Sequence, residues 1–116
     1  MSIDAFSVFT EETSSFDAGQ RAGASILDGL SSPLGLVLVH LTDNHDQQRF
    51  LEGLHGVLGS GIPVVGCSGQ GVMGRGKTVE DGYAAGLMGL GGQGVFFGSG
   101  FVEEIQDNPL EKGRTL

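Results

Sequence analysis

The chain has 116 residues, 39% of them hydrophobic and 17% charged, which is typical of one globular domain with a single modest core rather than of a disordered segment. Six Lys and Arg stand against 14 Asp and Glu, and the net charge of −8 argues against a nucleic-acid backbone or an anionic membrane as a partner. No run approaches the ~18 apolar residues of a membrane span, and the N-terminus lacks the basic and then apolar pattern of a secretory signal. Cys67 stands alone and cannot form an intrachain disulfide, so we expect a cytoplasmic protein.

Glycine is unusually frequent. It makes up 22 of the 116 residues, or about 19%, whereas its usual share is about 7%. The glycines show no collagen period and are densest from Gly53 onward, where they interrupt apolar runs. We interpret them as tight turns and as places where backbone segments approach closely.

The first five predicted elements alternate between strand and helix. Hydroxyls at 13–15 predict the start of the first helix, Asp43-Asn44 are expected to cap the second, and Gly59 or Gly61 to end it. This β-α-β-α-β order predicts parallel strand pairing with right-handed crossovers. The predicted ranges are strand 5–9, helix 18–30, strand 34–42, helix 50–58 and strand 62–67.

A different pattern follows the third strand. Residues 83–90 and 95–102 are predicted to be strands joined by the turn 91–94, which makes an antiparallel hairpin and a mixed sheet. The predicted fold class is therefore α/β, with helices packed on a mixed sheet. Residues 103–116 are predicted to form no closing element. We expect one domain over 1–116 that is a fragment or truncated form of something longer, with self-association as a further expectation.

Gly71–Thr78 reads GVMGRGKT and matches the nucleotide-binding P-loop pattern G-x-x-x-x-G-K-[ST]. A working P-loop follows a strand at once, and its GK[ST] opens a helix. Here the preceding strand is expected to end near Cys67, and the stretch 79–92 is interrupted by glycines that each cost a helix about 1 kcal/mol. The match is therefore interpreted as accidental, and nucleotide binding stays an alternative. Arg75 and Lys77 remain candidates for contact with an anion.

The stretch 62–82, IPVVGCSGQGVMGRGKTVEDG, resembles the core signature of the FIST domain, named for F-box and intracellular signal-transduction proteins. The matching features are a buried strand ending in VGCS, a turn that contains Gly71, a polar loop, and EDG at 80–82. The segment 34–58 also looks like the family's apolar strand, His-Asp turn and amphipathic helix. Two departures are Val72, where the family often has Glu, and Gly69-Gln70 in place of a small or hydroxyl-bearing pair.

The resemblance covers about residues 18–100 and implies a non-enzymatic sensory domain of intracellular signal transduction. It implies a small-molecule ligand, with amino acids proposed for the family, and a signalling protein partner. No catalytic residue, metal or cofactor is expected. The loop that leaves the carboxyl end of a parallel strand is where open α/β sheets place ligands, and its N–H groups and Ser68 Oγ suit a carboxylate. The predicted ligand-binding residues are Gly66, Cys67, Ser68, Gly69, Gln70, Gly71, Arg75 and Lys77.

A thiol-dependent enzyme centred on Cys67 is a further alternative, because His40 would lie beside it if their strands were neighbours. The competing interpretation is that a lone Cys in a strand is a small buried apolar residue. The His and Asp side chains within 40–46 match no strong zinc spacing and are expected to be structural. The phenylalanines within 95–102 are expected to lie in the core rather than to stack on nucleic-acid bases.

Overall fold

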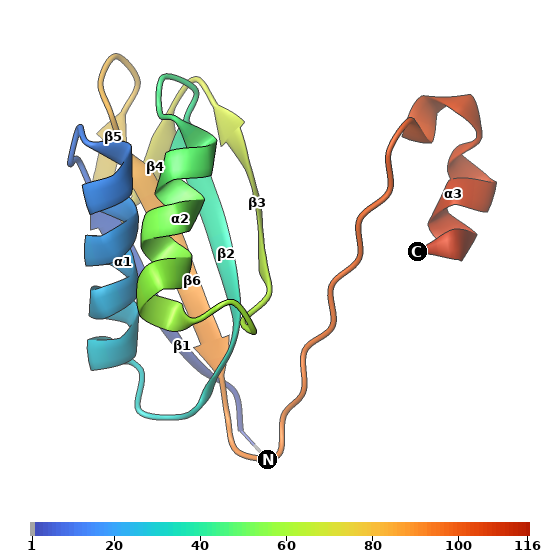
Figure 1. Cartoon of the computed structure of the whole chain (residues 1–116), viewed down its shortest axis with the longest axis horizontal. Helices are drawn as coiled ribbons and strands as arrows, with labels where there is room; N and C mark the ends of the chain where they lie inside the picture. The colour runs from blue at the N-terminus through green and yellow to red at the C-terminus, as the bar shows by residue number, and fades with distance from the viewer. Residues whose placement is uncertain (1) are drawn as a thin grey trace.

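The computed structural model describes residues 2–116, and its four long strands form one mixed sheet in the order β1-β6-β2-β3 (Figure 1). Strands β2 and β3 pair in parallel, whereas β6 is antiparallel to both β1 and β2. The predicted fold class, α/β with a mixed sheet, is confirmed. The strands are β1 (Asp4–Thr10), β2 (Leu34–Thr42), β3 (Val64–Gly69) and β6 (Ala85–Gly91).

The expectation of direct parallel pairing between the first two strands is wrong, because β6 lies between β1 and β2. Since β6 is antiparallel to both, β1 and β2 still run in the same direction. Glycines suit β6 to this central position: an added Cβ at Gly89 would lie 2.6 Å from Ile26 of the helix layer. The strand therefore fits where the helix layer comes close to the sheet.

Helices α1 (Ser15–Gly29) and α2 (Gln47–Leu58) lie side by side on one face of the sheet (Figure 1). Ser14 caps α1, as its position among the predicted hydroxyls indicated, and Asp46 caps α2 by accepting from the Arg49 N–H at 3.1 Å. The helix cap predicted at Asp43-Asn44 is therefore wrong. These residues lie in the turn before α2.

Apolar side chains from both helices and from the inward face of the sheet form the core. Phe50, Ile26 and Leu54 are its largest fully buried helical side chains, and they pack on the strands. Burial of this kind contributes roughly 1.5–3 kcal/mol for each large side chain. The strand residues of this core are Val8, Val37, Val39, Leu41, Ala85 and Leu87.

The second face of the sheet carries a short hairpin of strands β4 (Val72–Gly74) and β5 (Lys77–Val79). Arg75 and Gly76 form its two-residue turn with φ of 48° and 78°, as in a type I′ turn. The stretch 71–78 that was predicted to be a loop is thus a hairpin.

Beyond β6 the chain continues as an extended segment, followed by a 3-10 turn (Ile105–Asp107) and helix α3 (Pro109–Thr115). We call residues 92–116 the arm; Figure 1 shows it running beside the β3 edge of the body. The tail does contain a helix, which Asn108 caps and Pro109 starts, but none of the helix residues is buried and so it does not close the core. Within residues 2–116, no helix has the length and apolar character needed to cross a membrane.

The prediction of a strand at 95–102 is also wrong. The segment is extended, but it forms no ladder with the other strands described in residues 2–116. The turn after β6 contains Gly92 and Gly94 with positive φ of 152° and 69°, and the chain does not return along β6. Phe96 is 94% exposed and Phe101 is 86% exposed, so these two side chains are not in the core, whereas Phe97 packs over Gly35.

Candidate functional site

Most of the predicted ligand-binding residues line one of three separate cavities. We call them the arm cavity of about 640 Å³, the acidic cavity of about 450 Å³ and the hairpin cavity of about 350 Å³. Each volume falls in the range of roughly 300–1,000 Å³ that is usual for small-molecule sites.

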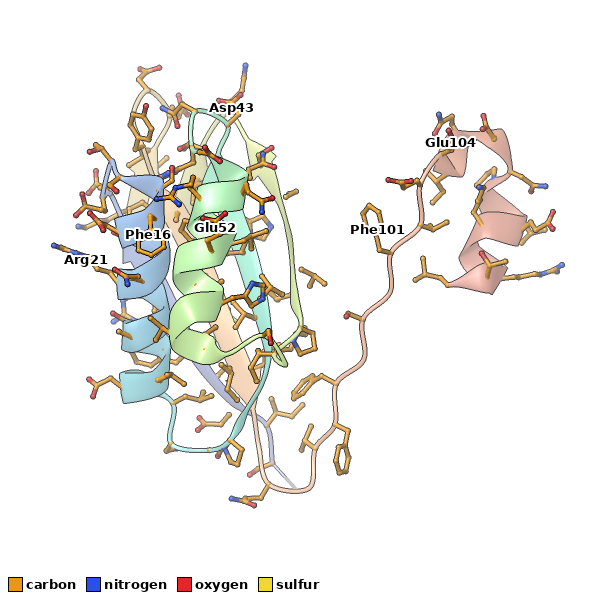
Figure 2. All side chains as sticks on the ribbon, viewed as in Figure 1. Phe16, Arg21, Asp43, Glu52, Phe101 and Glu104 are labelled. Carbon is orange, nitrogen blue, oxygen red and sulfur yellow. The ribbon has the colours of Figure 1, made fainter. Side chains whose placement is uncertain are left out.

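The arm cavity lies between α2, the edge of the sheet and the arm. Its walls are largely apolar, and three of the predicted residues, Gly66, Cys67 and Ser68, line it. From the arm, Ser99 to Phe101 line it, and Figure 2 shows the Phe101 ring on the side of the arm that faces the body. The remaining lining residues are Val39, Leu41, Gln47, Leu51, Val64 and Val65.

The position of this cavity follows from the parallel pairing of β2 with β3. Their carboxyl ends meet beside the start of α2, which is where α/β sheets commonly hold ligands. Gly66 permits the close pairing, because an added Cβ there would overlap the carbonyl oxygen of Val39. Gln47, the first residue of α2, brings a polar side chain to the same rim.

The acidic cavity is lined by Gln70 and Gly71 of the predicted site and by three acidic residues, Asp43, Glu80 and Asp81. Three carboxylates around one space disfavour an anion there and favour a positively charged group. Within residues 2–116 no group of three His, Cys, Asp or Glu is arranged to hold a metal ion. Gly69 lies beside this region, and its carbonyl accepts from the Asp43 N–H at 2.8 Å.

Arg75 and Lys77 lie in the hairpin itself, away from the other predicted ligand-binding residues. Arg75 lines the hairpin cavity on the second face of the sheet, and Lys77 Nζ lies 3.7 Å from a carboxylate oxygen of Glu11. The P-loop-like stretch forms β4, a tight turn and β5, and no helix begins at Lys77-Thr78. The backbone arrangement that gives a P-loop its phosphate affinity is therefore not formed here.

Strand register pairs His40 of β2 with Cys67 of β3, so the predicted proximity of these two residues is confirmed. Both residues are exposed. The expectation that Cys67 is a buried apolar residue is consequently wrong, because β3 is the edge strand of the sheet and the body covers it on one side only.

His45 is a buried polar residue whose environment the sequence did not indicate. It is 5% exposed, and its Nδ1 lies 2.8 Å from Ser15 Oγ, which also accepts from the Asp46 N–H at 2.9 Å. Ser15 Oγ and His45 Nδ1 share one hydrogen bond, and which of them donates depends on the imidazole tautomer. Within residues 2–116 Nε2 has no hydrogen-bond partner, and burial lowers the pKa of His45. Ser15 and His45 are 30 residues apart, so no local pattern could reveal the contact.

The α/β body, with a cavity at the carboxyl ends of its parallel strands, has an architecture in which ligand sites are common. A family profile described as the FIST N domain matches residues 35–115. The chain belongs to this family, which is a family of sensory domains in signal transduction. Comparisons with curated proteins and with solved structures gave no match.

Proposed function

We propose that this chain is a non-enzymatic module of a signalling protein that binds a small ligand in the arm cavity. One observation carries the proposal: the strand end that contains Gly66–Ser68 and the arm segment that contains Ser99–Phe101 line the same cavity. A ligand held there contacts both the rigid body and the segment that leads away from it.

The lining of the arm cavity indicates the chemistry of the ligand. None of the residues that line it within the described chain is charged, and polar groups are contributed by Gln47, Ser68 and Ser99. An apolar body would pack against Leu51 and Val64, while a polar end would meet the hydroxyls and the start of α2, where a carboxylate is favoured by the helix dipole. Amino acids with apolar side chains are therefore the first ligand class to test.

The arm supplies a physical route from binding to signalling. A ligand shifts a conformational equilibrium only by its difference in affinity between the two states. The state with the arm against β3 offers the ligand contacts from Ser99–Phe101, and a state with the arm released does not. Binding would thus hold the arm and α3 in one position, which a protein partner could recognise.

Thermal-shift measurements with each proteinogenic amino acid in turn test the proposal. Binding to the folded state alone at ~100-fold excess over Kd raises stability by about 2.7 kcal/mol. We expect apolar amino acids to stabilise the protein and Ser99→Trp, which fills the cavity from the arm, to abolish the shift. Gln106→Trp, an exposed arm position that does not line the cavity, should leave it unchanged.

The same assay with Mg-ATP and Mg-GTP separates this function from nucleotide binding. We expect neither nucleotide to raise the melting temperature. Stabilisation by Mg-ATP that disappears in Lys77→Ala would instead support the nucleotide alternative.

Thiol chemistry at Cys67 is a second candidate function, and the paired positions of His40 and Cys67 favour it. A neighbouring base activates a thiol by taking its proton. This candidate requires rapid alkylation of Cys67 by iodoacetamide at neutral pH, and slower alkylation in His40→Asn. A thiol that reacts no faster than free cysteine, at a rate that His40→Asn does not change, would remove it.

A further inference from the structure

The hairpin cavity lies on the face of the sheet opposite the two helices. Strand register places Ser7, Met88 and Leu38 in one row across β1, β6 and β2, and it places His40 beside Gly86 in the next row. These residues line the cavity together with Met73, Gly74 and Arg75 of the hairpin. Gly86 has no side chain, and this lets the hairpin come close to the sheet: an added Cβ there would lie 3.0 Å from Val72 Cγ1.

The charge of this cavity is opposite to that of the chain. Arg75 and His40 line it, and among residues 2–116 no Asp or Glu does, although the chain carries 14 acidic residues. Lys77, the other cation of the hairpin, is on β5 and pairs with Glu11. The hairpin cavity is thus a local site of positive charge on an acidic protein.

Arg75 occupies its position at a conformational cost. Its φ of 48° is in the left-handed region, at a turn position that favours Asn, Asp or Gly. Its side chain reaches the edge strand β1, where Nη1 donates to the Ser7 carbonyl oxygen at 3.0 Å and lies 3.4 Å from Ser7 Oγ, and the guanidinium carbon lies 5.7 Å from the centre of the Phe6 ring. A guanidinium carries five N–H donors, and within residues 2–116 the described hydrogen bonds use Nη1. Donors on Nε and Nη2 therefore remain for another acceptor.

Two apolar residues that line the hairpin cavity are exposed to solvent. Met73 is 79% exposed and Met88 is 39% exposed. Methionine side chains adapt to ligands of irregular shape, and they form the apolar surface of the cavity with Leu38.

We propose that the hairpin cavity binds a small carboxylate with an aliphatic chain, the carboxylate accepting hydrogen bonds from Arg75 and His40 and the chain packing on Leu38, Met73 and Met88. A guanidinium is suited to a carboxylate because its N–H groups match the two oxygens. This site shares no lining residue with the arm cavity, which is lined by residues of α2, of strands β2 and β3 and of the arm. Either site can fail its test without affecting the other.

Hexanoate is the probe, and hexan-1-ol is its uncharged match. The test is a titration of each compound into the full chain, followed by calorimetry and by the NMR signals of the methionine methyl groups. We expect saturable binding of hexanoate with shifts at Met73 and Met88, and much weaker binding of hexan-1-ol. Absence of saturable binding, or equal binding of the two compounds, overturns the proposal.

Variants at the turn separate the charge from the fold of the hairpin. Arg75→Asn creates the Asn-Gly pair that type I′ turns prefer, so the hairpin is retained while the guanidinium is removed. We expect the affinity for hexanoate to fall at least about tenfold, the loss expected for a charge-assisted hydrogen bond. Arg75→Lys, which keeps the positive charge but lacks the paired N–H groups, should restore only part of the affinity.

Lys77→Gln is the matched control, because it removes one positive charge from the same hairpin at a residue that does not line the cavity. We expect it to bind hexanoate as the unmodified chain does. Equal affinity in Arg75→Asn and in the unmodified chain, or an equal loss in Lys77→Gln, would overturn the assignment of the carboxylate to Arg75.

Discussion

At the scale of single residues, His45 joins three parts of the body. Its ring contacts Ser15 at the start of α1 and lies edge-on to Tyr83 of the loop before β6, with ring centroids 5.1 Å apart. The Phe50 ring of α2 is 6.0 Å away in a similar orientation. Apolar and aromatic surroundings favour the neutral imidazole, and this is why the pKa of His45 lies below 6.5.

This lowered pKa predicts that stability decreases in mild acid. The unfolded chain binds a proton at His45 with a pKa of about 6.5, whereas the folded chain resists protonation. The stabilisation is therefore fully present above about pH 6.5, and it is lost as the pH falls below that value towards the lower pKa of the folded state. Urea denaturation between about pH 5 and pH 8 measures this dependence.

His45→Gln should remove most of the loss of stability below about pH 6.5, since Gln does not titrate. His55→Gln in α2 serves as the matched control and should keep the dependence, because His55 is less buried. An unchanged pH dependence in His45→Gln would contradict the role given to this side chain.

At the scale of elements, α1 and α2 are held in direct backbone contact by glycines. An added Cβ at Gly19 would overlap the carbonyl oxygen of Phe50, and one at Gly53 would overlap the carbonyl oxygen of Phe16. The contact continues at the surface, where the Arg49 guanidinium lies 5.0 Å from the centre of the Phe16 ring. Figure 2 labels Phe16 and Glu52 on the two neighbouring helices.

Two substitutions in α2 test this packing. Gly53→Ala forces the helices apart and should destabilise the protein by about 1–3 kcal/mol. Gly56→Ala meets no atom within 4 Å and should stabilise it by roughly 0.5–1 kcal/mol, because alanine loses less entropy in a helix. Urea denaturation of both variants gives the comparison. Similar changes in the free energy of unfolding of the two variants would show that the close helix contact at Gly53 does not determine stability.

The sequence predicted those elements that depend on local patterns. The apolar run 34–42 coincides with β2, and the apolar stripe before Gly59 lies in α2. The position of the hairpin was not predictable in this way, because 71–79 and 91–100 are both glycine-rich. Contacts distant in sequence decide between them: Val72 packs over Gly86, and β6 inserts between β1 and β2.

The candidate site was predictable to a similar degree. Gly66 to Ser68 could be placed at the end of a parallel strand, and they line the arm cavity. The sequence did not indicate that Gln70 would lie among carboxylates, nor that Arg75 would be on the other face of the sheet, because both depend on how the hairpin folds back.

At the scale of the whole molecule, the arm is separate from the core of the body. Every residue of the main apolar core lies between Val8 and Leu87. The arm instead exposes apolar side chains, among them Phe96, Phe101 and Leu110. The main apolar core of the body is therefore formed without the arm.

Deletion of residues 95–116 should leave a folded body. We expect one cooperative thermal transition with secondary structure retained for the sheet and for α1 and α2, because the main core is intact. Stabilisation by apolar amino acids should disappear, since Ser99 and Phe101 are removed. Circular dichroism measures the first effect and thermal shift the second. Loss of folding, or binding that survives the deletion, would contradict this division.

Hydrogen–deuterium exchange tests the ligand-dependent arm most directly. The protein would be compared with and without a saturating concentration of the amino acid that gives the largest thermal shift. We expect slower exchange both in 64–69 of β3 and in 98–102 of the arm, with the hairpin at 72–79 unchanged, because the ligand bridges body and arm. Protection confined to the hairpin or to the acidic cavity, or no protection with any amino acid, would contradict the proposed function.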